Sequence, residues 1–124
     1  MNNVECPFCS KTIEKFAENN HSFAIFDQYP VSRGHALVIS KRHVSSFYSL
    51  NKLEQTECWR LVNKVREMLQ EDFQADGFNI GINLGEAAGQ TVFHTHIHII
   101  PRYVGDVDNP RGGVRHVING KGYY

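Results

Sequence analysis

Apolar positions recur at helical spacing in one long stretch in the middle of the chain. They fall mostly three or four residues apart, which places them on one side of a helix. Asn51 followed by Glu54 has the spacing of a capping box, and Asp76-Gly77 supplies a stop signal. The pattern therefore predicts one long helix over residues 53–73. Its apolar positions are Leu53, Cys58, Leu61, Val62, Val65, Met68, Leu69 and Phe73.

Short apolar runs bounded by turn residues predict strands on both sides of this helix. Residues 22–26 and 35–39 are expected to pair antiparallel, and residues 78–84 to pair with residues 91–100, which Pro101 ends. The tail, residues 102–124, is expected to be irregular, with one short strand at 114–118. The order of elements indicates an α+β domain: an antiparallel sheet of about five strands, covered on one face by the long helix, with one shorter helical segment.

Composition narrows the class of protein. A chain of 124 residues has the length of a single domain with one core. Its 13 basic and 13 acidic side chains cancel, which argues against a protein that neutralises a nucleic-acid backbone. No apolar run approaches the roughly 18 to 20 residues of a membrane span, and the first residues lack the pattern of a secretory signal. We therefore expect a cytoplasmic protein with no nucleic-acid or membrane partner.

Three histidines alternate within the expected strand 91–100. Because strand side chains alternate between faces, His94, His96 and His98 should project to one side. A rise of about 3.3 Å per residue separates the first from the third by about 13 Å, too far for one zinc ion with bonds of about 2.0 Å to bind all three. Two chemistries stay open: nucleophilic and acid–base catalysis by neutral imidazoles, or a catalytic metal bound by an adjacent pair.

The segment before the histidines is rich in hydrogen-bond donors. Residues 85–91 contain glycines, free backbone N–H groups and the side chains of Gln90 and Thr91. Such a loop can hold phosphate oxygens, although an ordinary hairpin turn has the same composition. Next to a row of histidines, the loop indicates an anion held against a nucleophile.

A cysteine pair lies near the start of the chain. Cys6-Pro7-Phe8-Cys9 has the spacing of a zinc knuckle, in which both thiolates reach one ion at about 2.3 Å. A redox pair would be expected after a strand and at a helix N-terminus, which is not its context. The alternatives are a zinc site that needs two further ligands or two reduced cysteines in a flexible arm, residues 1–16. Cys58, on the apolar side of the helix, is expected in the core.

The histidine segment resembles the signature of the histidine triad family, His-x-His-x-His followed by two apolar residues. His94-Thr95-His96-Ile97-His98-Ile99-Ile100 fits every position. This resemblance implies an α+β subunit that forms a homodimer by joining two sheets and binds a purine nucleotide at the triad strand. Other segments that share the resemblance are residues 23–27, 34–39 and 41–43, Asn83, and residues 89–92.

The resemblance also implies roles for individual residues. His96 would attack the α-phosphorus to give a covalent nucleotidyl-histidine, which water resolves. The implied catalytic set is His94, His96, His98, Gln90 and Thr91, with His98, Gln90 and Thr91 holding the phosphate oxygens. The implied nucleotide-binding set is Ile25, Phe26, Asp27, Asn83, Gly89, Gln90, Thr91 and His98.

Three residues have alternatives from their sequence context. Asp27 would grip the ribose hydroxyls, or it forms a turn before Pro30. Phe26 would line the base pocket, or it is a core aromatic. His35 corresponds to a histidine beside the triad strand and either joins the triad network by a hydrogen bond or is structural.

Some bacterial members of the family resemble this chain in carrying an N-terminal cysteine pair that binds structural zinc. The implied ligands are Cys6, Cys9, His43 and His94, which leaves His96 and His98 for chemistry. The expected function is a nucleotide hydrolase or nucleotidyl transferase, with dinucleoside polyphosphates favoured by residues 90–94 and by Pro101-Arg102. Hydrolysis of phosphoramidates or aminoacyl-adenylates, and a non-catalytic nucleotide sensor, stay open.

Overall fold

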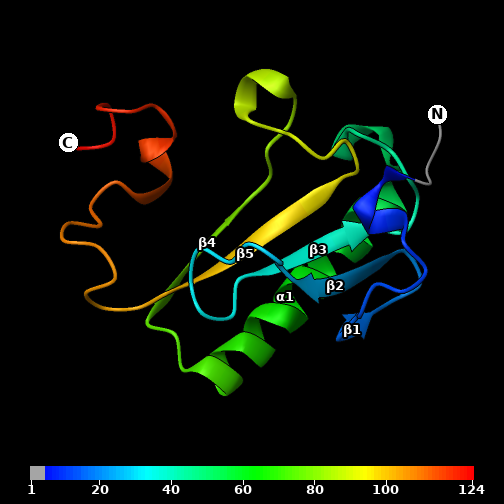
Figure 1. The fold of residues 1–124 in the computed structure, drawn as a ribbon, viewed down its shortest axis with the longest axis horizontal. Helices are drawn as coiled ribbons and strands as arrows, with labels where there is room; N and C mark the ends of the chain where they lie inside the picture. Colours follow the sequence, from blue (N-terminus) through cyan, green and yellow to red (C-terminus); the bar gives the residue numbers. More distant parts are fainter. Residues whose placement is uncertain (1–4) are drawn as a thin grey trace.

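A five-stranded antiparallel sheet forms the body of the protein, which a computed structural model describes for residues 5–124 (Figure 1). Its strand order is β1-β2-β3-β5-β4. The expected pairing of the first two long strands is confirmed, with Phe23 opposite Ile39. The bounds are β1 Ala17–Glu18, β2 Ser22–Phe26, β3 Ala36–Ser40, β4 Gly77–Gly81 and β5 His96–Arg102.

The predicted long helix is confirmed as α1, Lys52–Phe73. Its capping box is present: Glu54 N–H donates to Asn51 Oδ1 at 2.8 Å, and Asn51 N–H donates to Glu54 Oε1 at 2.9 Å. The helix ends earlier than the glycine suggests, because Gln74 adopts the left-handed conformation with φ 54°. Gly77 then begins β4.

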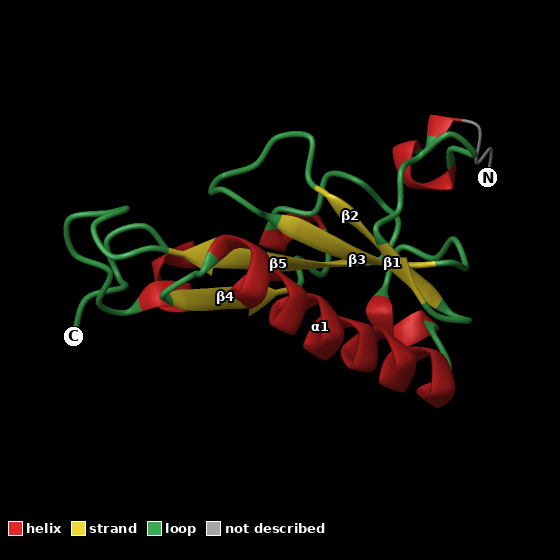
Figure 2. Cartoon of the chain, turned by 90° about the horizontal axis from the view of Figure 1, so that it is seen from below, coloured by secondary structure: helices red, strands yellow, loops and turns green. Residues whose placement is uncertain are grey.

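The two faces of the sheet have different roles. Figure 2 shows α1 against one face and the segment near the N-terminus on the other. Side chains that face α1, such as Val38 and Ile97, belong to the main apolar core. Alternation along the strands puts Leu37 and His98, which pair across β3 and β5, on the opposite face. The sheet therefore presents its histidines on the face that α1 leaves uncovered.

The prediction that residues 91–100 form one strand is wrong. β5 begins at His96, and Thr95 before it is tied to the loop after β3, because its N–H and Oγ both donate to Val44 O at 2.7 and 3.0 Å. Pro101 does not end the strand. Pairing with β3 stops at Ile99, so a residue without an N–H is tolerated where only β4 lies alongside. His94 thus precedes the strand that carries His96 and His98.

Smaller differences affect the other elements. The strand expected at 78–84 is β4, Gly77–Gly81, and the one expected at 35–39 begins one residue later, so that His35 precedes it. β1 has no counterpart in the sequence analysis. The segment 114–118 is a 3-10 turn, Gly113–Val117, rather than a strand. Further 3-10 turns occur at Pro7–Cys9, Phe47–Ser49 and Glu86–Ala88 in place of a single shorter helix.

Residues 1–4 of the expected N-terminal arm lie outside the described residues. Arg102, expected in the tail, is the last residue of β5. Within residues 5–124, no helix is both long enough and apolar enough to cross a membrane.

Candidate functional site

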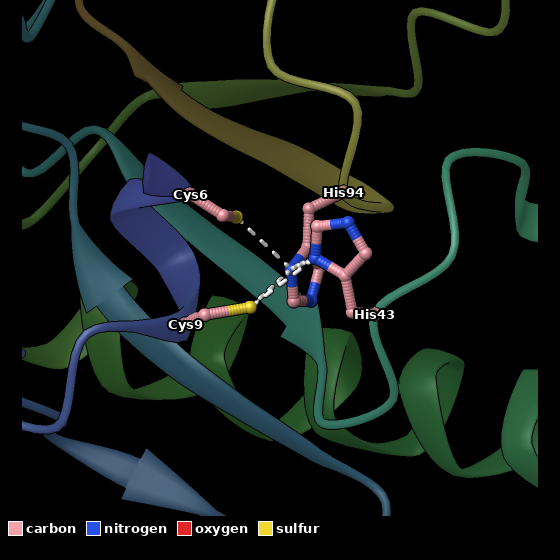
Figure 3. A group of neighbouring side chains, drawn as sticks. All are labelled: Cys6, Cys9, His43 and His94. Carbon is pink, nitrogen blue, oxygen red and sulfur yellow. Dashed lines mark hydrogen bonds between the residues drawn. The ribbon is translucent and has the colours of Figure 1, made fainter. Parts of the chain in front are cut away.

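The four expected metal ligands come together from three separate segments (Figure 3). Cys6 precedes the 3-10 turn Pro7–Cys9 and Cys9 ends it, His43 follows β3, and His94 precedes β5. Their ligand atoms all lie within 4.8 Å of one another. The structure therefore assembles a Cys2His2 set from positions up to 88 residues apart.

The spacing of these atoms fits zinc. A tetrahedral ion with Zn–S bonds of about 2.3 Å and Zn–N bonds of about 2.0–2.1 Å holds its nitrogens about 3.3 Å apart and each sulfur about 3.6 Å from each nitrogen. Nδ1 of His43 and Nδ1 of His94 are 3.1 Å apart. The sulfur–nitrogen distances are 3.2 Å for Cys9–His43, 3.4 Å for Cys6–His94 and 3.6 Å for Cys9–His94.

The backbone orients His94 for this role. Its Nε2 lies 2.6 Å from Ser40 O, and because a carbonyl can only accept, Nε2 carries the proton. Nδ1 therefore presents a lone pair to the cysteines, the arrangement that a metal-binding histidine adopts. Burial lowers the pKa of His94, which favours the neutral ring that binds metal. Burial, and then the neighbouring Cys6, raises the pKa of the Cys9 thiol, and a bound cation would favour the thiolate.

His96 lines a cavity on the open face of the sheet. Its Nδ1 lies 2.7 Å from His94 O and must be the protonated nitrogen, since the carbonyl accepts. Nε2 is then left with a lone pair. His96 borders a cavity of about 750 Å³, lined from the sheet side by Ile25, Phe26, Asp27 and Leu37.

Several expected nucleotide-binding residues meet at this cavity. Ile25, Phe26, Asp27 and Thr91 line it. Phe26 is 46% exposed and stacks on Phe16 with ring centroids 4.3 Å apart, so it is not a core aromatic. The Asp27 carboxylate also forms the turn suggested by its context, because Tyr29 N–H donates to Oδ1 at 2.9 Å.

Asn83, Gly89 and Gln90 lie outside the lining of this cavity. Gln90 is buried, and its side-chain amide donates to Ser45 O at 2.8 Å and to Val92 O at 3.2 Å. Its Oε1 accepts from Gly85 N–H at 2.9 Å. Gln90 thus supports the loop before the histidines, with both of its amide hydrogens directed at carbonyls.

A second cluster connects Asp27, which lines the cavity, with His35 and His98, which are not among the lining residues. Val31 N–H donates to His35 Nδ1 at 3.1 Å, so this nitrogen is unprotonated and the proton of the neutral ring lies on Nε2. That Nε2–H faces His98 Nδ1 at 3.0 Å and Asp27 Oδ2 at 3.5 Å. His98 Nδ1 must then accept, which places the proton of His98 on its Nε2.

Burial and neighbouring groups keep the rings of His35 and His98 neutral. Burial, followed by the neighbouring His96 and His35, lowers the pKa of His98 to about 4. Burial also lowers the pKa of His35, against the opposing effect of Asp27. Near pH 7, His98 is therefore a neutral hydrogen-bond donor through Nε2, next to the lone pair of His96; their ring centroids are 5.2 Å apart.

Comparison with known proteins decides the family. Residues 10–105 match the HIT domain. The chain belongs to the HIT family. A HIT relative, the bis(5'-adenosyl)-triphosphatase of Dictyostelium discoideum, is 40% identical over 103 residues, covering 83% of this chain and 69% of its own length.

Solved HIT structures share the fold. A HIT family protein from Bacillus anthracis superposes with a TM-score of 0.77 at 36% identity, covering 83% of this chain and 77% of the other. A zinc-bound histidine triad family protein from Mycobacterium smegmatis superposes with a TM-score of 0.77 at 33% identity, covering 85% and 80%. Together with the Cys2His2 cluster, this similarity indicates the zinc-containing branch of the HIT family.

Two site residues have no clear role from the sequence alone. His35 had two interpretations, and only its contacts show that it bonds to the triad. Phe8 had no signal beyond its place between the cysteines, yet its ring lies edge-on to His96, with centroids 5.1 Å apart. Neither contact follows from the spacing of the residues along the chain.

Proposed function

We propose that this HIT protein is a nucleotide hydrolase or nucleotidyl transferase that cleaves at the α-phosphate of purine nucleotide derivatives. One observation carries the proposal: His96 lines a cavity of about 750 Å³, and its Nδ1–H is held by His94 O, which leaves the lone pair on Nε2. A neutral, oriented imidazole at the wall of a cavity is the arrangement that nucleophilic catalysis needs.

In the first step, the Nε2 lone pair of His96 forms a bond to the α-phosphorus. The bond from phosphorus to the leaving-group oxygen breaks, and its electron pair stays on that oxygen. His98 Nε2–H donates to this oxygen as charge develops there, the kind of stabilisation that most strongly lowers such barriers. Thr91, at the cavity wall, supplies a further donor.

In the second step, water attacks the same phosphorus and the bond to Nε2 breaks, which returns the electron pair to His96. The proton released by water passes to the solvent, because His98 already carries a proton on Nε2 and accepts a hydrogen bond from His35 at Nδ1. Asp27 would hold the ribose hydroxyls, because each carboxylate oxygen can accept a second hydrogen bond besides its contact with Tyr29 or His35. Phe26 and Ile25 would contact the base. Gln90, Gly89 and Asn83 are proposed to shape the phosphate side through the loop and the end of β4.

Dinucleoside polyphosphates are the proposed substrate class, supported by the similarity to the bis(5'-adenosyl)-triphosphatase. Phosphoramidates and aminoacyl-adenylates are alternatives with the same α-phosphate chemistry. A nucleotide sensor without turnover is the alternative from another class.

Zinc is proposed as a structural ion bound by Cys6, Cys9, His43 and His94. It would cross-link the N-terminal segment to the sheet, which leaves the reaction to His96 and His98. A homodimer is also proposed, because β4 is an edge strand whose outer side has no partner among residues 5–124. Sedimentation at micromolar concentration would show a monomer if this part of the proposal is wrong.

The deciding experiment is His96→Ala with His21→Ala as a histidine control outside the site. We expect His96→Ala to lower turnover of diadenosine triphosphate by about 10³-fold or more, because it removes the nucleophile. AMP binding should persist, and mass spectrometry of quenched wild-type protein should place a nucleotidyl adduct on His96. Full turnover by His96→Ala would overturn the proposal, and absence of turnover in wild type with intact AMP binding would favour the sensor.

A further inference from the structure

The N-terminal segment, residues 5–16, lies over the open face of the sheet and forms part of the cavity wall. Phe8 and Ile13 pack on a small apolar cluster of that face. Pro7, Phe8, Ser10, Thr12 and Ile13 line the same cavity as His96. The wall of the proposed nucleotide site is therefore built from two parts, the sheet and this N-terminal segment. The cluster on the sheet consists of Phe23, Ile25, Leu37 and Ile39.

Phe8 connects the metal cluster to the proposed nucleophile. It lies inside the Cys6–Cys9 turn, with one ligand two residues before it and the other directly after it. Its ring meets His96 edge-on, with centroids 5.1 Å apart and planes at 71°, and meets His94 with centroids 5.9 Å apart at 77°. A displacement of the turn would therefore change the position of this ring relative to His96.

The polar attachment of this segment to the body depends on its sulfurs. Among residues 5–15, the hydrogen bonds described to other parts of the chain all involve Cys6 or Cys9. The backbone bonds of the segment, such as Cys9 N–H to Cys6 O at 3.1 Å, are internal to it. Regular pairing with the sheet begins only at Phe16, whose N–H donates to Ala24 O at 3.0 Å. Without a shared ion, the position of Phe8 would depend on the packing of Phe8 and Ile13, on thiol–imidazole hydrogen bonds and on the contact of Lys15 with the Phe23 ring.

We propose that zinc in the Cys6/Cys9/His43/His94 site sets the affinity of the cavity for nucleotide, and that Phe8 is the positioning residue that couples the two sites. Zinc fixes the turn, the turn fixes Phe8, and Phe8 completes the cavity wall beside His96. This inference rests on the proposed function, because it takes the cavity to be the nucleotide site. A purely structural zinc would stabilise the fold and leave the affinity of a folded, zinc-free protein unchanged.

The test measures AMP binding by calorimetry in zinc-loaded protein, in protein stripped by a chelator, and after zinc is restored. We expect stripping to weaken AMP binding by at least about fivefold, the lower end of typical coupling between sites, and zinc to restore it. Circular dichroism identifies the folded samples that can be compared. Equal AMP affinity in folded stripped and loaded protein would overturn the inference, whereas no AMP binding to either form would overturn the proposed function.

A Phe8→Ala variant separates coupling from stability. It keeps all four ligands, so we expect about one zinc per chain by mass spectrometry, together with the weak AMP affinity of stripped wild type. Removal of zinc from Phe8→Ala should cause little further loss, and Phe8→Tyr should restore both affinity and zinc dependence. Zinc-loaded Phe8→Ala with wild-type affinity would overturn the inference even if stripped wild type unfolds.

Tyr29→Ala is the matched control, because Tyr29 lines the same cavity but comes from the loop after β2. Its AMP binding should keep the full zinc dependence of wild type. Linkage supplies a second measurement: saturating AMP should tighten zinc binding by the same factor by which zinc tightens AMP binding. That factor should fall to about one in Phe8→Ala, and an unchanged factor there would assign the coupling to another residue.

Discussion

Two clusters of potential metal ligands lie on neighbouring parts of this protein. They differ in the backbone group that forms a hydrogen bond with one ring nitrogen of a histidine in the cluster. In the Cys6/Cys9/His43/His94 cluster, His94 Nε2–H donates to a carbonyl, so its other nitrogen offers a lone pair to an ion. In the Asp27/His35/His98 cluster, a backbone N–H donates to His35 Nδ1, so its other nitrogen carries a proton. A ring with a proton toward the cluster donates hydrogen bonds and does not bind metal.

This difference shows how the backbone assigns chemistry to side chains of the same type. Both clusters bring their ligand atoms within 4.8 Å of one another, so proximity alone would permit an ion in either. The tautomer decides between them, and a single carbonyl or N–H group decides the tautomer. We therefore assign metal binding to the first cluster and proton positioning to the second.

The largest expected effect comes from removing the cysteines. Cys6→Ser combined with Cys9→Ser should lower the zinc content from about one per chain to none. Because structural zinc supplies folding free energy, the Tm should fall by about 10 °C or more. The kcat at saturating nucleotide should fall less, within about tenfold, since His96 and His98 remain. Metal analysis and thermal denaturation check this.

Asp27→Asn sharpens the same comparison, because it alters the second cluster. It should retain zinc at the wild-type level. Loss of zinc from Asp27→Asn, or its retention without the two cysteines, would show that the assignment of the clusters is reversed.

A smaller effect is expected from His35, which we take to fix the tautomer of His98. His35→Leu removes the hydrogen-bond donor to His98 Nδ1. The kcat should therefore fall by roughly 10- to 100-fold, as is typical when a residue that orients a functional side chain is removed. His35→Gln keeps an N–H donor and should recover much of the activity. Nitrogen-15 NMR of the imidazoles should show the Nε2–H tautomer of His98 in wild type and a mixture in His35→Leu. A wild-type Nδ1–H tautomer would contradict the proposed chain of hydrogen bonds.

The smallest effect is on the pH dependence of stability. The pKa of His98 is lowered to about 4 in the folded protein, against an ordinary value of 6.5. At His98, the unfolded chain therefore binds a proton at higher pH than the folded one. The contribution of His98 to the free energy of unfolding is fully present above about pH 6.5 and is lost as the pH falls toward 4. His98→Gln should show a shallower loss of unfolding free energy over this range, measured by urea denaturation. Wild type and His98→Gln both keep the zinc ligands, so the effect of zinc release in acid cancels between them. An equal slope of unfolding free energy against pH in the two proteins would contradict the prediction.

The helix was predictable because local signals carry it. Apolar spacing and the Asn51–Glu54 cap define α1 without reference to other parts of the chain. The cysteine pair alone left a zinc site and two reduced thiols open, and the four ligands followed only from the resemblance to the HIT family. The histidine strand was harder, because alternation alone cannot distinguish a strand from an extended loop. His94 lies outside β5 since Thr95 bonds to Val44, a partner distant in sequence.

What the sequence alone determined is the set of chemical groups and the local elements: the long helix, short strands, the triad histidines, a cysteine pair and the resemblance to the HIT family. Only the tertiary structure decided which nitrogen of each histidine is free, because tautomers depend on backbone groups such as Ser40 O and Val31 N–H. It also decided that Phe8 lies against His96. These contacts join segments far apart along the chain, and folding rather than spacing brings them together.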